Sequence, residues 1–164
     1  MFKIINANFV TLFGIGKLPK IPGSYASLAT VIFLYSLFHI FGFEANFFLF
    51  ILVGVFIVSI FAINFYIKDK KNKDPKEIVI DEFIGQSIPI CLYEIAHSEI
   101  INQTNVITFY FIMFILFRIF DVSKPYPVNY YDKNFKNGFG VIMDDICAGL
   151  YVVGILVLYM IVTT

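Results

Sequence analysis

Charged side chains in this sequence gather where one apolar segment ends and the next begins. The stretch with the most potential chemistry carries an arginine, a lysine and three carboxylates: Arg118, Asp121, Lys124, Asp144 and Asp145. Arg118 and Asp121 are three residues apart, so on a helix they share a face. Taken alone, this pair fits an ordinary helical ion pair, and Asp144 fits an ordinary acid in a first helical turn. The functional interpretation therefore depends on the surroundings of these groups.

Two helix ends are expected within this stretch. A proline disfavours helical geometry for the residue before it, so Pro125 predicts that a helix ends near Ser123. Asp144 and Asp145 follow two glycines, and we expect them to open the next helix, where the helix dipole favours negative charge. These two ends would bring carboxylates and cations to one level.

Two further polar clusters precede apolar segments. The first runs from Gly14 to Ser27, where glycines permit close backbone approach and two serines offer a helix cap or a ligand hydroxyl. Capping is the simpler interpretation for Ser24, and Ser27 lies one turn further on. In the second cluster Asp81 and Glu82 open an apolar segment, and Asp81 is also a reasonable helix N-cap.

Composition indicates a membrane protein. The chain has 164 residues, which suits one domain covering 1–164, and it is 59% hydrophobic but only 15% charged. Soluble domains carry about 25% charged residues, and a domain of this size buries only about 70% of its unfolded surface. Much apolar surface would thus stay exposed in water. The net charge of zero gives no basic footprint for nucleic acid. The oligomeric state stays open.

Cysteine and histidine do not form a recognisable site. Cys91 and Cys147 lie in apolar segments without metal-ligand spacing, which favours packing. His39 and His97 are far in sequence from the charged clusters, so we assign neither a role.

Charge-free apolar segments predict the membrane topology. Four are long enough for a hydrocarbon core that needs about 20 residues, and they are Ile21–Phe43, Ala45–Ile67, Ile100–Phe117 and Ile146–Thr164. A fifth segment, Phe83–Ala96, is shorter and contains Gln86, Ser87 and Pro89. Its length alone favours a re-entrant or protein-buried segment.

The distribution of basic residues favours five crossings. The lysines and the arginine fall in three regions: Lys3, Lys17 and Lys20; Lys68, Lys70, Lys71, Lys73 and Lys76; Arg118, Lys124, Lys133 and Lys136. Five crossings put all three regions on one side, which is the cytoplasmic side by the positive-inside rule. We expect an all-α polytopic membrane helix bundle with about five membrane segments. Met1–Gly16 would form a short helix at the membrane interface or packed under the bundle.

This topology brings the three clusters to one depth at the cytoplasmic interface. Ionisable groups at membrane depth are costly and usually functional. The five carboxylates Asp81, Glu82, Asp121, Asp144 and Asp145 cannot share a small site unless cations neutralise them, and two basic side chains are too few. An all-oxygen ligand set without cysteine or histidine favours Mg²⁺ over zinc. Arg118 and Lys124 would then hold the remaining charge of a phosphate.

The residue set also limits the reaction class. It offers no Ser-His-Asp set, and no cysteine precedes an arginine at the spacing of a cysteine phosphatase loop. The attacking group is then water activated by a metal or a carboxylate that forms a phosphoryl intermediate. A metal-assisted phosphoester hydrolase acting on a lipid satisfies these constraints.

Other functions fit the pattern less well. A phosphatidyltransferase would need two further spaced aspartates, whereas Asp144 and Asp145 are adjacent. Histidine-dependent membrane phosphatases are disfavoured because both histidines are expected on the far side of the membrane. A small transporter of divalent cations, using buried carboxylates, is the alternative of a different class, and it predicts acidic residues near mid-membrane.

The clusters together resemble the phosphatidylglycerophosphatase A family of bacterial lipid phosphatases. That family combines GxGxxP, PGTxGS, DExxG, FRxFDxxKPxP and GxGxMxDDxxAG motifs, which correspond here to Gly14–Pro19, Pro22–Ser27, Asp81–Gly85, Phe117–Pro127 and Gly138–Gly149. Ser24 stands where the family has threonine, and Ala26 stands where it has glycine. The resemblance covers most of the chain, in order.

The resemblance implies Mg²⁺-dependent hydrolysis of phosphatidylglycerophosphate to phosphatidylglycerol and phosphate, on the cytoplasmic face of the bacterial inner membrane. We hypothesise that Mg²⁺ is held by Asp81, Glu82, Asp121 and Asp145, and that catalysis involves these four and Asp144. The substrate phosphate would be bound by Arg118, Lys124, Ser24 and Ser27. Which carboxylate acts as nucleophile or base stays open.

Overall fold

The computed structural model describes residues 2–70, 72, 75–97 and 103–163, and every regular element in these residues is helical. The elements are α1 (Phe2–Val10), the 3₁₀ turn η1 (Ile15–Lys17), α2 (Pro22–Tyr35), the π-helical turn η2 (Ser36–Ile40), α3 (Ala45–Ile67), α4 (Ile80–His97), α5 (Gln103–Ser123), α6 (Val128–Asn134) and α7 (Gly138–Thr163). The predicted all-α fold is confirmed.

Four helical segments are long and apolar enough to cross a membrane: Pro22–Ile40, Ala45–Ile67, Val106–Ser123 and Gly138–Val162. The fifth long helix is α4, which contacts α2, α3, α5 and α7. Its polar residues Gln86 and Ser87 are fully buried. Neighbouring helices therefore shield a helix that is too polar to face lipid, as membrane-embedded polar groups require. Four apolar helices around α4 agree with about five membrane segments.

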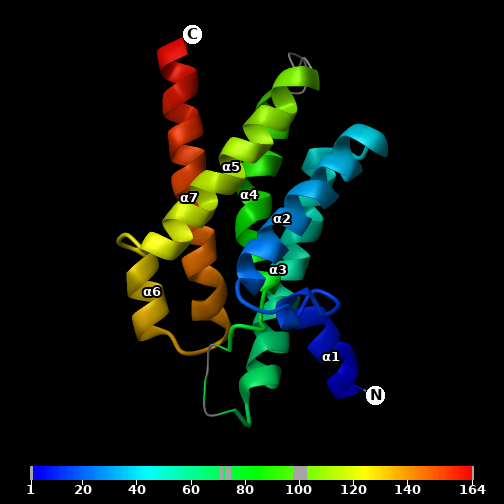
Figure 1. Ribbon diagram of the computed structural model, residues 1–164, viewed down its shortest axis with the longest axis vertical. Coiled ribbons are helices and arrows are strands. Elements are labelled where there is room, and N and C mark those ends of the chain that lie inside the picture. Colours follow the sequence, from blue (N-terminus) through cyan, green and yellow to red (C-terminus); the bar gives the residue numbers. More distant parts are fainter. Residues whose placement is uncertain (1, 71, 73–74, 98–102, 164) are drawn as a thin grey trace.

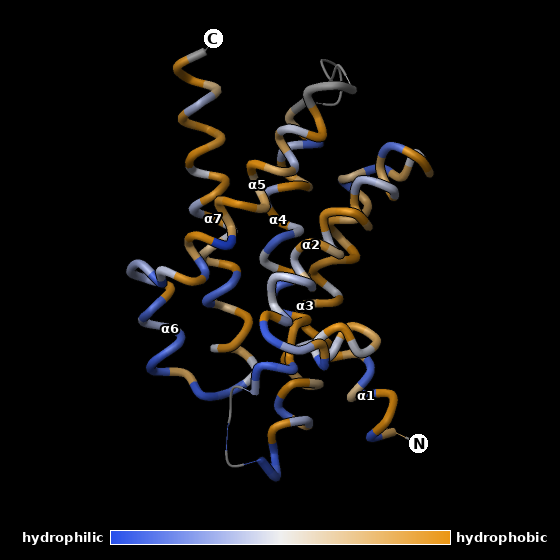
Figure 2. The backbone as a smooth tube through the Cα atoms, in the orientation of Figure 1, coloured by the Kyte–Doolittle hydropathy of each residue, from blue (hydrophilic) through white to orange (hydrophobic). Residues whose placement is uncertain are grey.

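The long helices run alternately up and down between two ends of the molecule (Figure 1). One end, here called the basic end, carries α1, the connection from α3 to α4, and α6. The hydropathy colouring shows that hydrophilic residues are concentrated at this end (Figure 2). Lys71 and Lys73 of the predicted basic connection lie outside the described residues, as do residues 98–102 of the connection between α4 and α5. The opposite end, here called the far end, carries η2 and the C-terminal part of α7.

Two glycines bring α7 against α4. A Cβ added at Gly85 would lie 2.6 Å from the carbonyl oxygen of Asp145, and one at Gly149 would lie 2.4 Å from the carbonyl oxygen of Gly85. Small residues let helix backbones approach closely in membranes. This close contact positions the Asp145 region beside the first turn of α4, which carries Asp81 and Glu82.

One predicted helix start is wrong. Helix α7 begins at Gly138, so Asp144 and Asp145 lie in its second turn and do not open it. The cause is an earlier cap, because the side-chain oxygen of Asn137 accepts the backbone N–H of Gly140 at 3.0 Å. Asparagine is among the preferred N-cap residues. By contrast, α5 ends at Ser123 as predicted.

The capping interpretations of two other residues are also wrong. Helix α2 begins at Pro22 with Ile21 as its N-cap, so Ser24 lies inside the first turn. Helix α4 begins at Ile80, which places Asp81 in the first turn as well. The Asp81 carboxylate accepts the backbone N–H of Glu82 at 3.1 Å. Asp81 therefore still satisfies one first-turn N–H group of α4, although it is not the N-cap residue.

Helix α1 fits the expected interfacial segment. It packs on α3, where the Asn6 amide donates to the Ala62 carbonyl at 3.1 Å and the rings of Phe2 and Phe65 lie 5.2 Å apart. Its outer face exposes Ile4 and Ile5. An apolar outer face at the basic end is suited to the boundary between lipid and water.

Candidate active site

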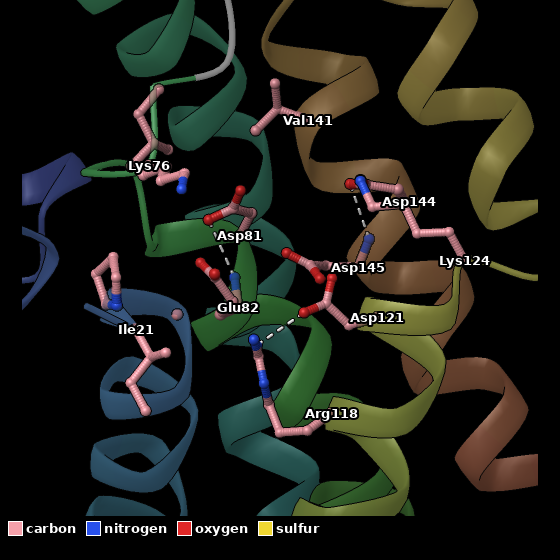
Figure 3. Close-up of a pocket in the computed structure, with 13 residues that line it drawn as sticks. Ile21, Lys76, Asp81, Glu82, Arg118, Asp121, Lys124, Val141, Asp144 and Asp145 are labelled. Carbon is pink, nitrogen blue, oxygen red and sulfur yellow. Dashed lines mark hydrogen bonds and ion pairs between the residues drawn. The ribbon is translucent and has the colours of Figure 1, made fainter.

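A polar cavity of about 230 Å³ opens at the basic end between α2, α4, α5 and α7 (Figure 3). Its walls combine acidic, basic and backbone groups: Ile21, Pro22, Gly23, Lys76, Ile78, Asp81, Glu82, Arg118, Asp121, Lys124, Val141, Asp144 and Asp145. Seven of the nine predicted site residues line it. The sequence prediction that distant clusters converge is therefore matched by the geometry of the cavity.

Three carboxylates form the centre of the cavity. Asp81, Glu82 and Asp145 each offer one oxygen, and these oxygens lie within 4.8 Å of one another. Glu82 Oε2 and Asp145 Oδ1 are buried without a hydrogen-bond partner among the described residues. At an effective dielectric constant of 20, two unit charges at this distance repel by roughly 3.5 kcal/mol. A bound cation, or protonation of one of the acids, would relieve this repulsion.

The donor set fits a hard divalent cation. An octahedral Mg²⁺ with ligands at about 2.0–2.1 Å holds neighbouring oxygens about 3 Å apart, so small side-chain rotations would bring these three carboxylates into range. Carboxylate oxygens without sulfur or imidazole suit hard cations such as Mg²⁺ and Mn²⁺ better than zinc or copper. Asp121, the fourth predicted metal ligand, faces the same cavity but is not one of the three clustered acids.

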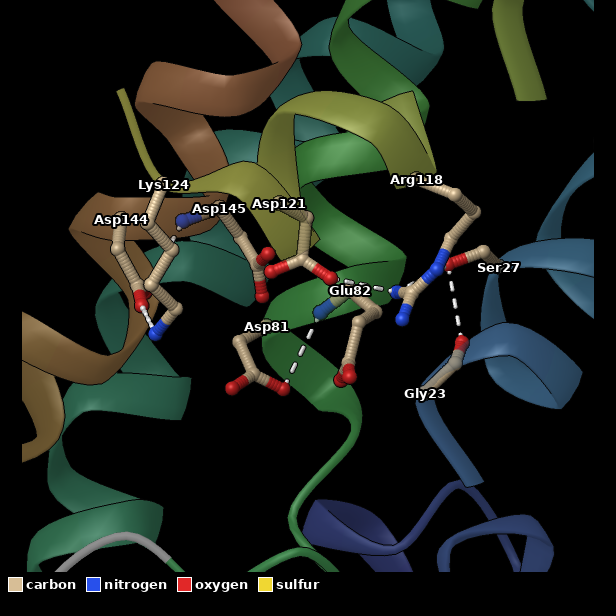
Figure 4. A network of polar contacts seen from close by, with 9 residues as sticks. All are labelled: Gly23, Ser27, Asp81, Glu82, Arg118, Asp121, Lys124, Asp144 and Asp145. Atoms are coloured by element: carbon tan, nitrogen blue, oxygen red, sulfur yellow. Dashed lines mark hydrogen bonds and ion pairs between the residues drawn. The ribbon is translucent and has the colours of Figure 1, made fainter. Parts of the chain in front are cut away.

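Arg118 is fixed between α5 and α2. Its guanidinium lies 2.8 Å from Asp121 Oδ2 and donates to Ser27 Oγ at 3.4 Å (Figure 4). The Ser27 hydroxyl in turn donates to the Gly23 carbonyl at 3.0 Å. Arg118 Nε is buried without a partner among the described residues. The arginine is thus held in place while one of its donors stays unused.

Gly23 leaves room for this arrangement. A Cβ at that position would lie 2.1 Å from Glu82 Oε1 and 3.3 Å from Arg118 Nη1. Ser27 is fully buried behind Arg118, so its contact with the cavity runs through the arginine. Ser24 does not line the cavity. The geometry therefore offers no direct support for phosphate binding by either serine.

Lys124 connects two acids across the mouth of the cavity. Its ammonium lies 3.2 Å from Asp144 Oδ2 and 2.6 Å from Asp132 Oδ1. Burial opposes the charged form, but the hydrogen bond with Asp132 and the charge of Asp144 outweigh it and raise the pKa of Lys124. The lysine remains a cation at neutral pH.

The backbone of Lys124 is strained. Its φ angle is 45°, in the left-handed region where a helix usually ends with glycine. A side chain at such a position costs free energy, and strained residues of this kind cluster at functional sites. Leu12, Phe13 and Lys20 also have positive φ angles, so the conformation of Lys124 ends α5 and does not by itself assign a function.

Sequence reasoning missed two residues near the cavity. Lys76 lines it from the connection before α4, and Asp132 of α6 pairs with Lys124. The sequence analysis places Lys76 only in a basic connection. Its closeness in sequence to Asp81 could have indicated that it lies near the site. Nothing in the sequence indicated that Asp132 lies near the site, because its position depends on how the short helix α6 packs against α7.

A separate buried carboxylate lies at the far end. Glu94 Oε1 is 3.1 Å from His39 Nε2 and accepts the hydroxyl of Tyr110 at 2.9 Å. His39 therefore has a structural partner that its position in the sequence did not suggest. The side chain of His97 lies outside the described residues. Cys91 and Cys147 are buried and unpaired, consistent with packing.

Comparison with known proteins identifies relatives along most of the chain. A sequence model of the family described as phosphatidylglycerophosphatase A matches residues 8–160. A Haemophilus influenzae protein named phosphatidylglycerophosphatase A is 31% identical over 141 residues, covering 86% of this chain and 80% of the relative. An Escherichia coli protein of the same name is 34% identical over 154 residues, covering 88% and 77%.

A third relative bears a different name. This Bacteroides thetaiotaomicron protein is 32% identical over 145 residues, covering 86% of this chain and 84% of its own, and is provisionally named as a phosphatidylinositol-3-phosphatase. No solved structure shows significant similarity to the chain.

Proposed function

The chain belongs to the phosphatidylglycerophosphatase A family, and on this premise we propose that it is a Mg²⁺-dependent phosphatase of phosphatidylglycerophosphate. Water would attack the terminal phosphorus, the bond from phosphorus to the glycerol oxygen would break, and the products would be phosphatidylglycerol and inorganic phosphate. The names of two relatives and the arrangement of the cavity support this reaction.

The observation that carries the proposal is the cluster of three carboxylates beside two basic side chains, Arg118 and Lys124, that are held in place by ion pairs. Asp81, Glu82 and Asp145 would hold Mg²⁺, which supplies Lewis acidity toward a phosphoryl oxygen and water. Arg118 and Lys124 would bind the other phosphoryl oxygens, and their charge would match the negative charge that builds up in the transition state.

Asp121 is the carboxylate we assign to the attacking water. It lies outside the three-acid cluster, and Arg118 fixes one of its oxygens at 2.8 Å. A carboxylate oriented in this way can accept the proton that water loses when it attacks phosphorus. Asp144 would act with Asp132 to hold Lys124 in position.

The cellular location follows from the same argument. The chain is a membrane protein with bacterial relatives. We place the basic end on the cytoplasmic side of the inner membrane, since Lys and Arg accumulate on that side. The cavity would then meet phospholipid head groups of the cytoplasmic leaflet.

The test is phosphate release by the purified protein in detergent with long-chain phosphatidylglycerophosphate. We expect release with Mg²⁺, loss of release after chelation with EDTA, and recovery when Mg²⁺ is restored in excess. Phosphatidylinositol 3-phosphate is the comparison substrate, because one relative carries its name. Release from neither lipid in the presence of Mg²⁺ would contradict the proposal.

The same preparation tests the cation-transport alternative. Transport through the bilayer needs carboxylates along a path across it, whereas Asp81 and Glu82 of the three-acid cluster lie in the first turn of α4, next to the connection from α3. We therefore expect no Mg²⁺ uptake into vesicles that contain the protein.

A further inference from the structure

The polar cavity is too small for a whole phospholipid. Its volume of about 230 Å³ is far below the volume of a phospholipid with two long acyl chains. That space suits one phosphate group and a hydrated cation. The acyl chains of a lipid substrate must therefore lie on another surface, and that surface must adjoin the cavity.

An apolar groove of about 610 Å³ runs along α7 within the membrane-spanning part of that helix. Its lining residues, apart from Pro127 at the start of α6, all belong to α7: Cys147, Leu150, Tyr151, Gly154, Ile155, Val157 and Leu158. The groove thus offers an apolar surface at the depth of lipid hydrocarbon.

One ion pair of the polar cavity lies close in sequence to two residues of the groove. Lys124 and Asp144 line the cavity and lie 3.2 Å apart. Cys147 lies one turn beyond Asp144 on the same face of α7, and Pro127 lies three residues beyond Lys124. The linings of the polar cavity and the apolar groove are therefore adjacent both along α7 and along the connection from α5 to α6.

Another apolar groove, of about 380 Å³, is less well connected. It includes Ile80 and Phe83 of α4. At 100° per residue, these two project from the side of α4 opposite Asp81 and Glu82. Helix α4 itself thus stands between this groove and the three-acid cluster.

From this geometry we infer that the α7 groove binds an acyl chain of the glycerophospholipid substrate, with Lys124 meeting a head-group phosphate at the junction. The inference rests on the proposed function and adds the place where the lipid lies. A substrate chain in this groove enters from the bilayer side, so its head group reaches the cavity past Lys124 without leaving the membrane interface.

Gly154 allows a selective test. A Cβ added there meets nothing within 4 Å, so the backbone tolerates a side chain at this position, and Gly154→Leu would place that side chain in the groove. Gly54 of α3 is the matched control, because it is also exposed and helical and its added Cβ also meets nothing within 4 Å. Both substitutions favour the helix, since leucine has a higher helix propensity than glycine.

Hydrolysis of dioleoyl and dihexanoyl phosphatidylglycerophosphate would be compared for wild type, Gly154→Leu and Gly54→Leu in lipid nanodiscs. We expect Gly154→Leu to raise KM for the dioleoyl substrate about tenfold, equivalent to about 1.4 kcal/mol, with a much smaller change for the dihexanoyl substrate. Gly54→Leu should match wild type with both.

Three results would overturn the inference: an equal loss on both substrates, no change on either, or a change of oligomeric state confined to Gly154→Leu, which would show that a second copy covers the groove. If wild type hydrolyses neither substrate, the proposed function itself fails. An active wild type with an unchanged substrate ratio in Gly154→Leu rejects the groove alone.

Discussion

Two buried acidic sites at opposite ends of the bundle differ in how their charge is satisfied. At the far end, Glu94 stands alone and receives both His39 and Tyr110 within hydrogen-bond distance. At the basic end, Glu82 and Asp145 share a cluster with Asp81, and each keeps a buried oxygen without a partner among the described residues.

We interpret this difference as one between a structural carboxylate and carboxylates with a function. A buried polar group costs free energy unless it is hydrogen-bonded, and the Glu94 network meets this requirement with protein groups alone. The cluster at the basic end does not meet it, so the protein retains a local instability there that a bound cation would relieve. Four substitutions can break or sharpen this contrast.

The largest effect is expected for Asp145→Asn. The substitution keeps the shape of the side chain but removes one charge from the cluster, so we predict a loss of about 10³-fold in kcat. Without Mg²⁺ the same variant should unfold at a higher temperature than wild type, because repulsion within the cluster falls. Activity assays and thermal unfolding in EDTA measure both. The account would be contradicted if Asp145→Asn kept its phosphatase activity, or if it unfolded in EDTA at a lower temperature than wild type.

Lys124→Gly should give the next largest effect. Glycine adopts the positive φ of this position without strain, which offsets part of the stability lost with the ion pairs to Asp132 and Asp144, so thermal stability should fall only slightly. Loss of the ammonium should lower kcat/KM by about 50-fold, equivalent to ~2.3 kcal/mol of transition-state stabilisation. Parallel measurement of melting temperature and steady-state kinetics checks the prediction. Equal losses of stability and activity would show that the lysine is only structural.

Asp132→Asn should have a moderate effect. It removes one of the two acids that hold Lys124 and leaves Asp144 in place. We expect a decrease of about fivefold in kcat/KM, on the order of 1 kcal/mol. Combining it with Lys124→Gly should give no further loss if Asp132 acts through the lysine, and additive losses would reject that role.

Glu94→Gln should have the smallest effect on activity, within about twofold of wild type. It should instead lower the free energy of unfolding by about 1–3 kcal/mol, because the buried contacts with His39 and Tyr110 are weakened. Denaturation followed by circular dichroism and the phosphatase assay test both points. A large loss of activity in a folded variant would remove the contrast between the two ends.

The sequence predicted the parts of the fold that depend on local patterns. The end of α5 at Ser123 follows from the proline two residues later, and the span Ala45–Ile67 follows from its unbroken apolar run. The start of α7 was misjudged because Asn137 caps the helix earlier than the acidic pair suggested. Convergence of Asp81 with Asp145 was predictable because the basic residues determine the topology.

Partners across helices were not predictable in the same way. Pairing of Asp132 with Lys124, and of Glu94 with His39, depends on the rotation of each helix about its axis. That rotation is determined by packing, for example by the close contact of Gly85 with α7. Residue spacing predicts which side chains share one face of a helix, but it does not predict which neighbouring helix that face contacts.

Binding of a divalent cation tests the central claim most directly. Mn²⁺ can replace Mg²⁺ as a spectroscopic probe, and electron paramagnetic resonance of the purified protein would count its sites. We predict a tight site in wild type and in Glu94→Gln that is lost in Asp145→Asn and in Glu82→Gln. Absence of a site in wild type, or equal binding by Asp145→Asn, would contradict the claim that these carboxylates converge to hold a metal ion.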